Sequence, residues 1–492
     1  MKYIYLGGAG EVGASCLLIQ VAGRNILIDC GIRVNQRGHT AYPDLQRLKW
    51  HAHDLDAVFI SHAHADHIGG LLTLQRSYPK TPIFMTGPTA DLATVMLLSA
   101  HQLTNIHREV RHTIKEIPND RYSAEDLSLR RDYLTAKFKS VLEELKKYTI
   151  IDTDAWIDLE WGDTWAFRFI PSGHILGAVS IELRTPEGNF LYTGDVSAFR
   201  QRIVDGIGDN LSGINPDFMW CESTYGNGDH PARKTEERRL VEAVTTIIQA
   251  GGKVLIPSFA LGRAQEIIMI LLSYMQSGII PDFPILTDGL VNKICDVYEE
   301  NICFTSQRFQ HWAERSPNLF YTPPIRRVRE RAREHFLRMD TPYCVIASSG
   351  MLVGGASVDY ARALAGHPKN AIFLSGYQDA ESPGAELQAM QQGDYLTLSN
   401  GDALQVNCNV EKFHLSAHSD QGQLIKMIKA ANPKQIALAH GNARATQALH
   451  GKLFKDFPVT VAINCQLYDT TPKGVREATH RYIETGPPYS VS

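Results

Sequence analysis

Four side chains that can bind a metal ion crowd into the stretch 61–67, which reads Ser-His-Ala-His-Ala-Asp-His. These side chains are His62, His64, Asp66 and His67. The stretch directly follows the apolar run Ala57–Ile60, and at a strand end His62 and His64 point to the same side. Imidazole and carboxylate ligands without a thiolate suit a catalytic zinc ion that keeps a position open for water. A surface histidine cluster is the alternative, but one this dense is hard to explain at a buried strand end.

Short strand-like runs separated by glycine turns fill much of the first two hundred residues, and helical periodicity interrupts them. The predicted strands are Tyr3–Leu6, Cys16–Val21, Asn25–Ile28, Ala57–Ser61, Phe167–Ile170, Val179–Leu183 and Phe190–Tyr192. The predicted helices are His67–Tyr78, a segment near Pro88–His107, and Ala124–Tyr148. Two sheets packed face to face beneath such helices predict an αββα sandwich.

The spacing of the apolar runs increases from about Lys253, where they are separated by segments long enough for helices. These runs are Val254–Ile256, Ile285–Thr287, Cys344–Ala347 and Ile372–Leu374. Their spacing indicates parallel βαβ crossovers. From about residue 401 the chain returns to alternating strands and helices, with Asp420 placed to cap a helix and Ile436–Ala439 strand-like. We therefore predict an α/β protein in which residues 223–400 form a domain inserted between residues 1–222 and 401–492.

The composition is that of an ordinary globular protein, with 44% hydrophobic and 21% charged residues over 492 positions. The formal net charge of −4 excludes a generally basic, nucleic-acid-coating protein, so any nucleic-acid site must be local. Eight cysteines without a C-x-x-C pair indicate reduced, buried thiols. The start lacks a signal-peptide core, and no stretch approaches the ~20 apolar residues that span a bilayer. Cytoplasmic residence without membrane attachment is the expectation.

The pattern H-x-H-x-D-H after a strand resembles the signature motif of the metallo-β-lactamase superfamily, whose other motifs follow in order. Asp29, in Leu-Ile-Asp-Cys-Gly, matches the first motif, whose carboxylate orients the loop. His174, in Ser-Gly-His-Ile-Leu-Gly, matches the third, and Asp195, in Tyr-Thr-Gly-Asp, matches the fourth, which bridges two metals. Alone, each would more often be a loop histidine or a turn aspartate. In this series the resemblance implies that His174 and Asp195 are ligands.

Later segments resemble the β-CASP branch of that superfamily, whose members process nucleic acids. Glu222 matches motif A, His418 matches motif B and His440 matches motif C, which completes the second metal's ligands. Each has an ordinary alternative as an ion-pair partner, a helix-cap neighbour or a core histidine, and His414 competes with His418. Supporting matches are residues 256–266, 348–352 and 375–378. The resemblance covers nearly the whole chain and implies a metallo-β-lactamase sandwich with an inserted β-CASP domain on a mostly parallel sheet.

Within this branch, Glu222 together with His440 resembles the RNA-processing type, typified by the pre-mRNA 3′-end processing endonuclease and its prokaryotic relatives. Members that repair DNA usually have an apolar residue at motif C. One departure concerns the residues after His440, where the family often reads His-Gly-Glu and this chain has Asn442. Metal binding is expected to survive this change, whereas the orientation of His440 is left open.

The resemblance implies a ribonuclease, by expectation an endonuclease, with two Zn²⁺ per chain. The implied metal ligands are His62, His64, Asp66, His67, His174, Asp195 and His440. A hydroxide bridging the metals would attack phosphorus, oriented or deprotonated by Asp66, and His418, held by Glu222, would protonate the leaving oxygen. The products would carry a 5′-phosphate and a 3′-hydroxyl. The expected partner is single-stranded RNA, and a homodimer is expected from the relatives.

Local positive charge for RNA is richest in the segment Pro323–Arg338, which has six arginines against two glutamates. Its apolar residues, Ile325, Val328, Ala332 and Phe336, fit one stripe of a helix. The predicted RNA-binding residues are Arg326, Arg329 and Arg333, with Arg263 and Ser349 as weaker candidates. A helix whose arginines are simply solvated is an equally good explanation.

Three other functional classes stay open at this point. A thioester or lactone hydrolase shares the first four motifs but does not need Glu222, His418 and His440. A DNA nuclease shares more, and His440 is the strong argument against it. A catalytically silent binding subunit normally lacks metal ligands, whereas here each is present. The sequence is compatible with both endonuclease and exonuclease action.

Overall fold

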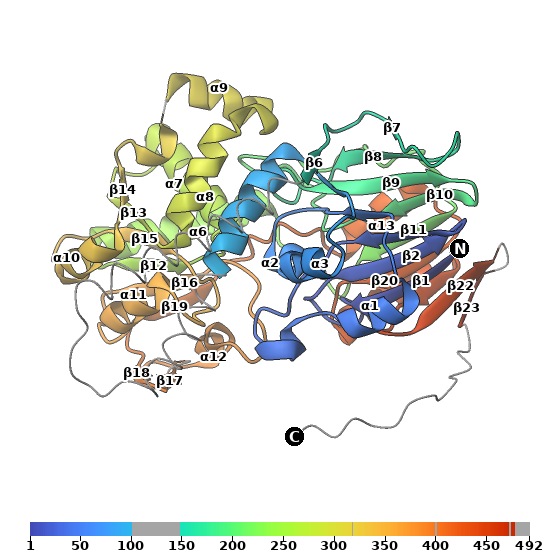
Figure 1. The fold of residues 1–492 in the computed structure, drawn as a ribbon. Coiled ribbons are helices and arrows are strands. Elements are labelled where there is room, and N and C mark those ends of the chain that lie inside the picture. Colours follow the sequence, from blue (N-terminus) through green and yellow to red (C-terminus); the bar gives the residue numbers. More distant parts are fainter. Residues whose placement is uncertain (101–147, 317, 399–400, 472–473, 478–492) are drawn as a thin grey trace, which may run out of the picture.

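The computed structural model of the chain describes residues 1–100, 148–316, 318–398, 401–471 and 474–477 (Figure 1). The predicted helix Ala124–Tyr148 lies outside these ranges except for its last residue, which begins a strand. Two halves lie side by side in Figure 1. One consists of two stacked sheets built from both ends of the chain, and the other is built around a third sheet from its middle.

The first half is the predicted αββα sandwich. Its eight-stranded sheet contains, in spatial order, β23 (Gly474–Glu477), β22 (Leu467–Thr471), β1 (Lys2–Gly7), β2 (Cys16–Val21), β3 (Arg24–Ile28), β4 (Ala57–Phe59), β5 (Ile83–Met85) and β6 (Tyr148–Ile150). Its seven-stranded sheet contains β21 (Val459–Val461), β20 (Ile436–Ala439), β11 (Phe218–Glu222), β10 (Gly188–Tyr192), β9 (Val179–Thr185), β8 (Ala166–Pro171) and β7 (Ile157–Asp158). Both sheets thus combine N-terminal and C-terminal strands.

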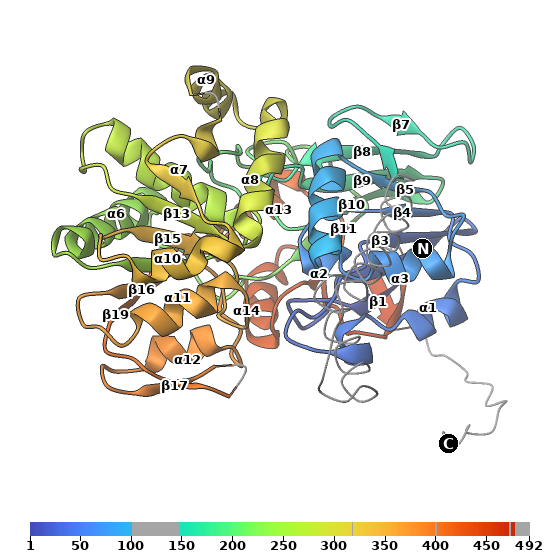
Figure 2. The ribbon, with the colours of Figure 1, turned by 60° about the vertical axis from the view of Figure 1, so that its left-hand side comes forward.

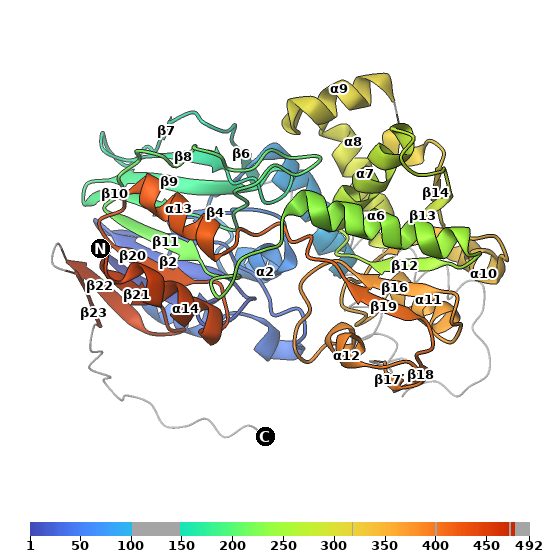
Figure 3. The same cartoon turned by 180° about the vertical axis from the view of Figure 1, so that it is seen from behind.

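The alternation of side chains along β1 explains why the sandwich has layers. Tyr3 and Tyr5 point between the sheets, where they join aromatic residues such as Phe59 and Trp220. The intervening residues, Ile4 and Leu6, point to the opposite face, which is covered by helices. On that side lie α1 (Leu45–His51), α2 (Ala65–Ile68) and α3 (Leu71–Ser77) (Figure 1). On the outer face of the other sheet lie α13 (Gln421–Ala431) and α14 (Ala443–Leu453) (Figure 3).

The second half is built on a six-stranded sheet in which every recorded strand pair is parallel, as the βαβ spacing predicts. Its order is β14 (Ile325–Arg327), β13 (Ile285–Asp288), β15 (Cys344–Ala347), β12 (Val254–Pro257), β16 (Ala371–Leu374) and β19 (Asn409–Lys412). One face packs on α6 (Arg233–Gln249), α7 (Arg263–Gln276) and α8 (Leu290–Glu300), and the other on α11 (Ala356–Leu364) and α12 (Pro383–Ala389) (Figure 2). Since β19 lies beyond residue 400, the boundaries 222/223 and 400/401 stay predictions.

Two predicted helices have a different form in the structure. The predicted helix His67–Tyr78 is interrupted at Gly69 and Gly70, because these glycines pack closely against the loop 30–32 and leave no room for a side chain. The predicted helical stripe in Pro323–Arg338 is wrong, since this segment forms β14, a 3-10 turn and the short helix α10 (Arg333–Arg338). Ile325 and Val328 are buried because one lies in a strand and the other in the loop after it.

Within the described ranges, none of the helices combines the length and the apolar character that crossing a bilayer requires. The loops that follow β4, β8, β10, β11 and β20 lie at the edge of the sandwich that faces the second half (Figure 3). Because β10, β11 and β20 are parallel neighbours, their C-terminal ends share this edge. The predicted ligands therefore meet where the two halves face each other.

Candidate metal centre

A first group of ligand atoms forms beneath the loop after β4. It consists of His62, His64, His174 and Asp195. His64 Nδ1 lies 3.1 Å from both His62 Nε2 and His174 Nε2, and Asp195 Oδ2 lies 3.5 Å from His62 Nε2. Ligands at about 2.0–2.1 Å from a tetrahedral zinc ion are about 3.3 Å from one another. The spacing of this group therefore suits one metal ion.

A second group lies on the other side of Asp195 and consists of Asp66, His67 and His440. His440 Nε2 lies 3.3 Å from His67 Nε2 and 3.4 Å from Asp66 Oδ2. The other oxygen of Asp195, Oδ1, is 3.5 Å from His67 Nε2. One carboxylate thus faces both groups, which is the geometry of a bridging ligand. The structure brings all seven predicted ligands together, and their role as ligands stays a prediction.

The hydrogen bonds of the five imidazoles give a test of whether a metal fits. In four of the rings, the nitrogen that points away from the centre has an oxygen partner, whereas His440 Nδ1 lies 3.2 Å from Thr224 Oγ1 and also 3.1 Å from Asp195 Oδ1. The four partners are Ser61 Oγ for His62, Leu261 O for His64, Asp29 Oδ2 for His67 and Ala417 O for His174. Outer partners of this kind fix the tautomer and leave the inner nitrogen free to bind a metal.

Asp195 supplies a second observation in favour of a metal. Its Oδ1 is buried and makes no well-aligned hydrogen bond among the described residues, although His440 Nδ1 lies 3.1 Å and His67 Nε2 3.5 Å from it. A buried carboxylate oxygen without a well-aligned donor is costly, and a cation placed between the two groups would remove that cost. The residues present therefore fit a pair of metal ions.

Without a metal, the imidazoles of the centre differ in charge. Burial would lower the pKa of His67, but the carboxylates of Asp195, Asp29 and Asp66 raise it well above its usual value. Burial lowers the pKa of His62 and of His174 well below the usual value, which favours the neutral imidazole that a metal needs. Burial would raise the pKa of Asp195, but the positive charges of His440 and His67 hold it well below its usual value. Asp195 is therefore ionised at neutral pH.

Asp29 organises the loop without joining either group, as the resemblance implies. It has a left-handed backbone conformation, with φ at 60°, and its side chain is fully buried. Its carboxylate accepts hydrogen bonds from the backbone N–H and the hydroxyl of Ser61, and from the Tyr192 hydroxyl. The same carboxylate accepts from His67 Nδ1 at 2.8 Å. Asp29 thus ties the histidine loop to β10.

Sequence reasoning missed the groups that orient these side chains. Thr224 is the partner of His440 Nδ1 at 3.2 Å, and its hydroxyl also donates to the carbonyl of His440. Asn442, where the family often has glutamate, caps α14 by accepting from Ala445 N–H at 2.9 Å. Thr224, and not residue 442, therefore orients His440. A threonine inside a motif carries no signal that would mark this role.

His418 and Glu222 form a pair beside Asp195. His418 Nδ1 lies 3.0 Å from Glu222 Oε1, while His418 Nε2 is 3.8 Å from Asp195 Oδ2. Glu222 is held by the backbone N–H of Val196, which donates to Oε1 at 2.8 Å. Burial lowers the pKa of His418, but Glu222 and Asp195 together raise it to about 9. His414 belongs to none of the clusters of potential ligands among the described residues and does not line the cleft over the centre, whereas His418 clusters with Glu222 and Asp195 and lines that cleft.

A cleft of about 250 Å³ lies over the centre and is lined by both halves of the molecule. The sandwich contributes Asp66, His174 and His418, and the second half contributes Arg263 and Tyr377 among others. Arg263 is the first residue of α7 and is 6% exposed, and its Nη1 has no acceptor among the described residues. Burial and the nearby Arg233 lower the pKa of Arg263 to about 9. An unpaired guanidinium in this cleft suits a phosphate group.

The other predicted RNA-binding residues do not line this cleft. Ser349 is engaged within its own loop, where its hydroxyl donates to Gly354 O. Arg326 and Arg329 are exposed, and Arg333 is bound to Asp288 and Asp359. Figures 1 and 3 show α10 at the end of the second half that is remote from the sandwich. Their role in RNA binding stays a prediction, separate from the metal centre.

Comparison with known proteins gives matches along most of the chain. Residues 9–92 match the metallo-beta-lactamase superfamily, residues 264–387 match the Beta-Casp domain, and residues 403–463 match the Zn-dependent metallo-hydrolase RNA specificity domain. Each match lies in a different predicted segment of the chain.

Full-length relatives extend this likeness. The chain is 32% identical over 452 residues to transcription termination factor FttA of Methanocaldococcus jannaschii, covering 90% of this chain and 67% of that protein. It is 31% identical over 441 residues to the RNase J-like protein of the same organism, covering 88% and 91%. It is 27% identical over 472 residues to Integrator complex subunit 11 of Gallus gallus, covering 95% and 72%. The predicted resemblance is confirmed, and the chain belongs to the RNA-processing β-CASP branch of the metallo-β-lactamase superfamily.

Proposed function

We propose that this protein is a zinc-dependent endoribonuclease that hydrolyses phosphodiester bonds of single-stranded RNA and leaves a 5′-phosphate and a 3′-hydroxyl. The observation that carries the proposal is the bridging geometry of Asp195, which faces a metal-sized group of ligands on each side, next to the His418–Glu222 pair. The similarity to an RNase J-like protein and to an RNA specificity domain supports RNA as the substrate.

Zinc fits the centre better than magnesium because imidazole nitrogens make up most of the ligand atoms. Magnesium prefers oxygen ligands and usually keeps several waters. When bound, two zinc ions supply an activated water as the nucleophile and positive charge against the phosphoryl oxygens. Removal by a chelator should therefore abolish cleavage, and zinc should restore it.

The protein's own side chains have three tasks around the scissile phosphate. Asp66, which lines the cleft, orients the attacking water and accepts its proton. Arg263 binds a phosphate oxygen with its unpaired guanidinium. His418 donates a proton from Nε2 to the leaving 3′-oxygen, because Glu222 occupies Nδ1 and keeps the ring protonated. Glu222 thus acts as a positioning residue for His418.

The depth of the centre favours a single strand over a duplex. His62 and His67 are fully buried, and the cleft above them is lined by side chains of both halves. A flexible strand can pass a phosphate into such a cleft, whereas a stiff duplex cannot bend far enough without a large cost in free energy. The same argument favours single-stranded DNA equally, so the choice of RNA depends on the relatives and must be tested.

The decisive experiment combines metal analysis with digestion of end-labelled single-stranded RNA and DNA of identical sequence. The wild-type protein is expected to cut RNA internally, and His418→Ala is expected to lose cleavage while it keeps its zinc. Cleavage of DNA as fast as RNA, or release of mononucleotides from one end without internal products, would refute the corresponding part of the proposal.

A further inference from the structure

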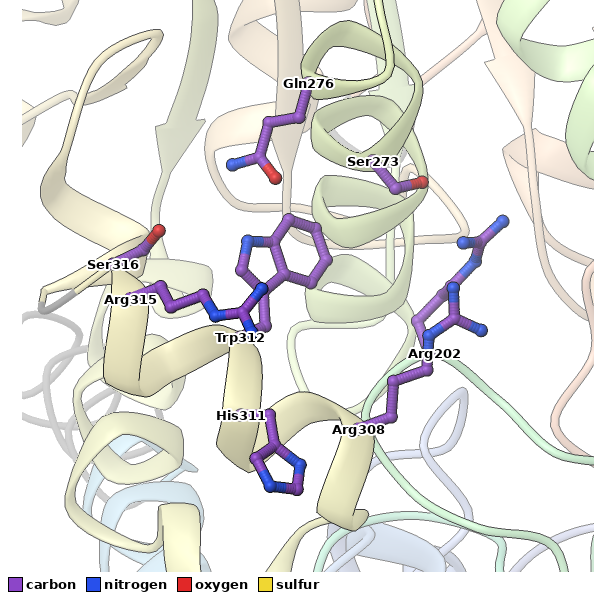
Figure 4. A pocket seen from close by; sticks show the side chains of 8 residues that line it. All are labelled: Arg202, Ser273, Gln276, Arg308, His311, Trp312, Arg315 and Ser316. Atoms are coloured by element: carbon purple, nitrogen blue, oxygen red, sulfur yellow. The ribbon is translucent and has the colours of Figure 1, made fainter.

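A second hollow, of about 660 Å³, lies between α9 (Gln307–Arg315) and the last turn of α7 (Figure 4). Its lining residues from α9 are Arg308, His311, Trp312 and Arg315. Their spacing of three, four and seven residues from Arg308 places all four on one face of the helix. Another face carries the buried Phe309 and Ala313. The helix is thus fixed to the core by one face and presents a basic, aromatic face to the hollow.

The arginines of this face are not neutralised by neighbouring acids. Arg308 and Arg315 are exposed, and no ion pair is recorded for either among the described residues. A third arginine, Arg202, lines the same hollow but is paired with Glu237. In a chain with a net charge of −4, two uncompensated guanidinium groups beside an indole form a local positive site. Such a site favours a polyanion.

The arrangement of the side chains fits a nucleotide better than a plain anion. Figure 4 shows the indole of Trp312 facing the space between the two helices, with Gln276 of α7 across from it. Arg315 lies at one end of this space, and Arg308 lies near Arg202 at the other. The indole of Trp312 is half-buried against the core, and the part that faces the hollow can stack on a base while the flanking guanidinium groups bind the phosphates on either side of that base.

Two structural connections join the hollow to the metal centre. Helix α7 begins with Arg263 in the metal cleft and ends with Gln276 in the hollow, which are about 20 Å apart along the helix axis. Ser306, which caps α9, donates its N–H to Ile203 O at 2.8 Å, and Gln201 in the same segment donates to the carbonyl of His174. A strand several nucleotides long can therefore reach both places.

We propose that the hollow between α9 and α7 is an accessory binding site for single-stranded RNA, which holds the strand several nucleotides away from the bond that is cut. The proposal rests on the proposed ribonuclease function for its biological meaning, but not for its binding chemistry. An acidic protein segment would satisfy the arginines and leave the indole without a stacking partner. The site would lower KM for long RNA and leave the chemical step unchanged.

The test is the binding of a fluorescently labelled oligouridylate of about 20 nucleotides, measured by anisotropy over a series of salt concentrations. Arg308→Gln/Arg315→Gln is expected to weaken binding about tenfold and to reduce the salt slope by about 1.4, since two phosphate contacts are lost. Trp312→Leu keeps an apolar side chain and is expected to weaken binding about tenfold with the salt slope unchanged. The charge-matched control Arg238→Gln/Lys369→Gln changes exposed cations on the same half and is expected to bind like wild type.

Equal binding of oligouridylate by the wild type and by Arg308→Gln/Arg315→Gln would overturn the proposal. Competition by polyglutamate as effective as competition by unlabelled oligouridylate would overturn the assignment to RNA. Cleavage is measured separately on a long RNA and on a short oligonucleotide, and the arginine variant should raise KM for the long RNA alone. If the wild type cuts no RNA but the binding pattern holds, the proposed function fails and the accessory site stands.

Discussion

The histidine loop after β4 and the arginine-rich segment 323–338 are both dense in polar side chains that could bind a ligand. The two sets of side chains have different partners in the structure. The loop meets residues from five other places in the chain and turns each imidazole inward. The arginine segment instead directs Arg327 and Arg333 to acids of its own half, namely Asp296, Asp288 and Asp359. Charge density alone thus does not mark a binding site, whereas ligand spacing at a strand end marks one because the backbone fixes the geometry.

The same contrast appears inside the second half. The face of α9 has fewer arginines than the segment 323–338, but Arg308 and Arg315 stay unpaired beside an indole and a hollow. What distinguishes a surface that is free to bind from one that stabilises the fold is whether its charges are already matched. The predictions below test this distinction, starting at the metal centre.

The largest effect is expected from Asp195→Ala, which removes the carboxylate that faces both ligand groups. Zinc content should fall from two ions per chain, and RNA cleavage should drop by about ten-thousandfold or more, since metals contribute several kcal/mol to such reactions. Elemental analysis and single-turnover cleavage measure the two effects. Asp217→Ala, at an acid that pairs with Lys434 on the surface, is the control and should change neither. Full zinc content in Asp195→Ala would contradict the bridging geometry.

The next effect is expected from His418→Ala, which should lower kcat about a thousandfold through loss of the general acid. Zinc content should stay unchanged, because His418 belongs to neither of the two groups that the seven predicted ligands form. His414→Ala provides a matched control at the competing position and should cleave like wild type. A loss of zinc in His418→Ala would show that this residue is a ligand and not a proton donor.

Arg333→Met tests the arginine segment, and its effect should appear in stability and not in catalysis. Asp288 is 1% exposed and would lose its bidentate partner, so the free energy of unfolding should fall by about 3 kcal/mol. Chemical denaturation measures this change, and cleavage per folded molecule should stay at the wild-type level. A rise in KM for RNA without loss of stability would instead show that Arg333 binds RNA, as the sequence predicts.

The smallest effects separate Thr224 from Asn442 as the residue that orients His440. Thr224→Val removes the hydroxyl beside His440 Nδ1 and should weaken zinc binding about tenfold. Asn442→Ala removes the cap of α14 and should cost about 1 kcal/mol of stability with zinc affinity unchanged. Competition with a chelator gives the affinities. The reverse pattern would mean that residue 442 orients His440 although its side chain caps α14.

The fold could be predicted from periodicity because alternation along strands such as β1 and the long spacing from Val254 onwards are local features. The candidate ligands could be found because His62–His67 is dense and the remaining motifs follow the family order. Thr224, Tyr192 and the carbonyl of Leu261 could not be found, since their roles arise from contacts across the chain. The error at Pro323–Arg338 arose because apolar residues three apart also occur where an edge strand with one buried residue, Ile325, runs into a loop with another, Val328.

The central claim is that Asp195 joins two metal sites built from seven side chains. The most direct measurement is the number of zinc ions bound per folded chain in protein prepared with sufficient zinc. It is made on the wild type, on His62→Ala and on His440→Ala. Two zinc ions per wild-type chain and one fewer in each variant are expected, because the two histidines belong to different groups. A correctly folded wild-type chain without stoichiometric metal would contradict the claim.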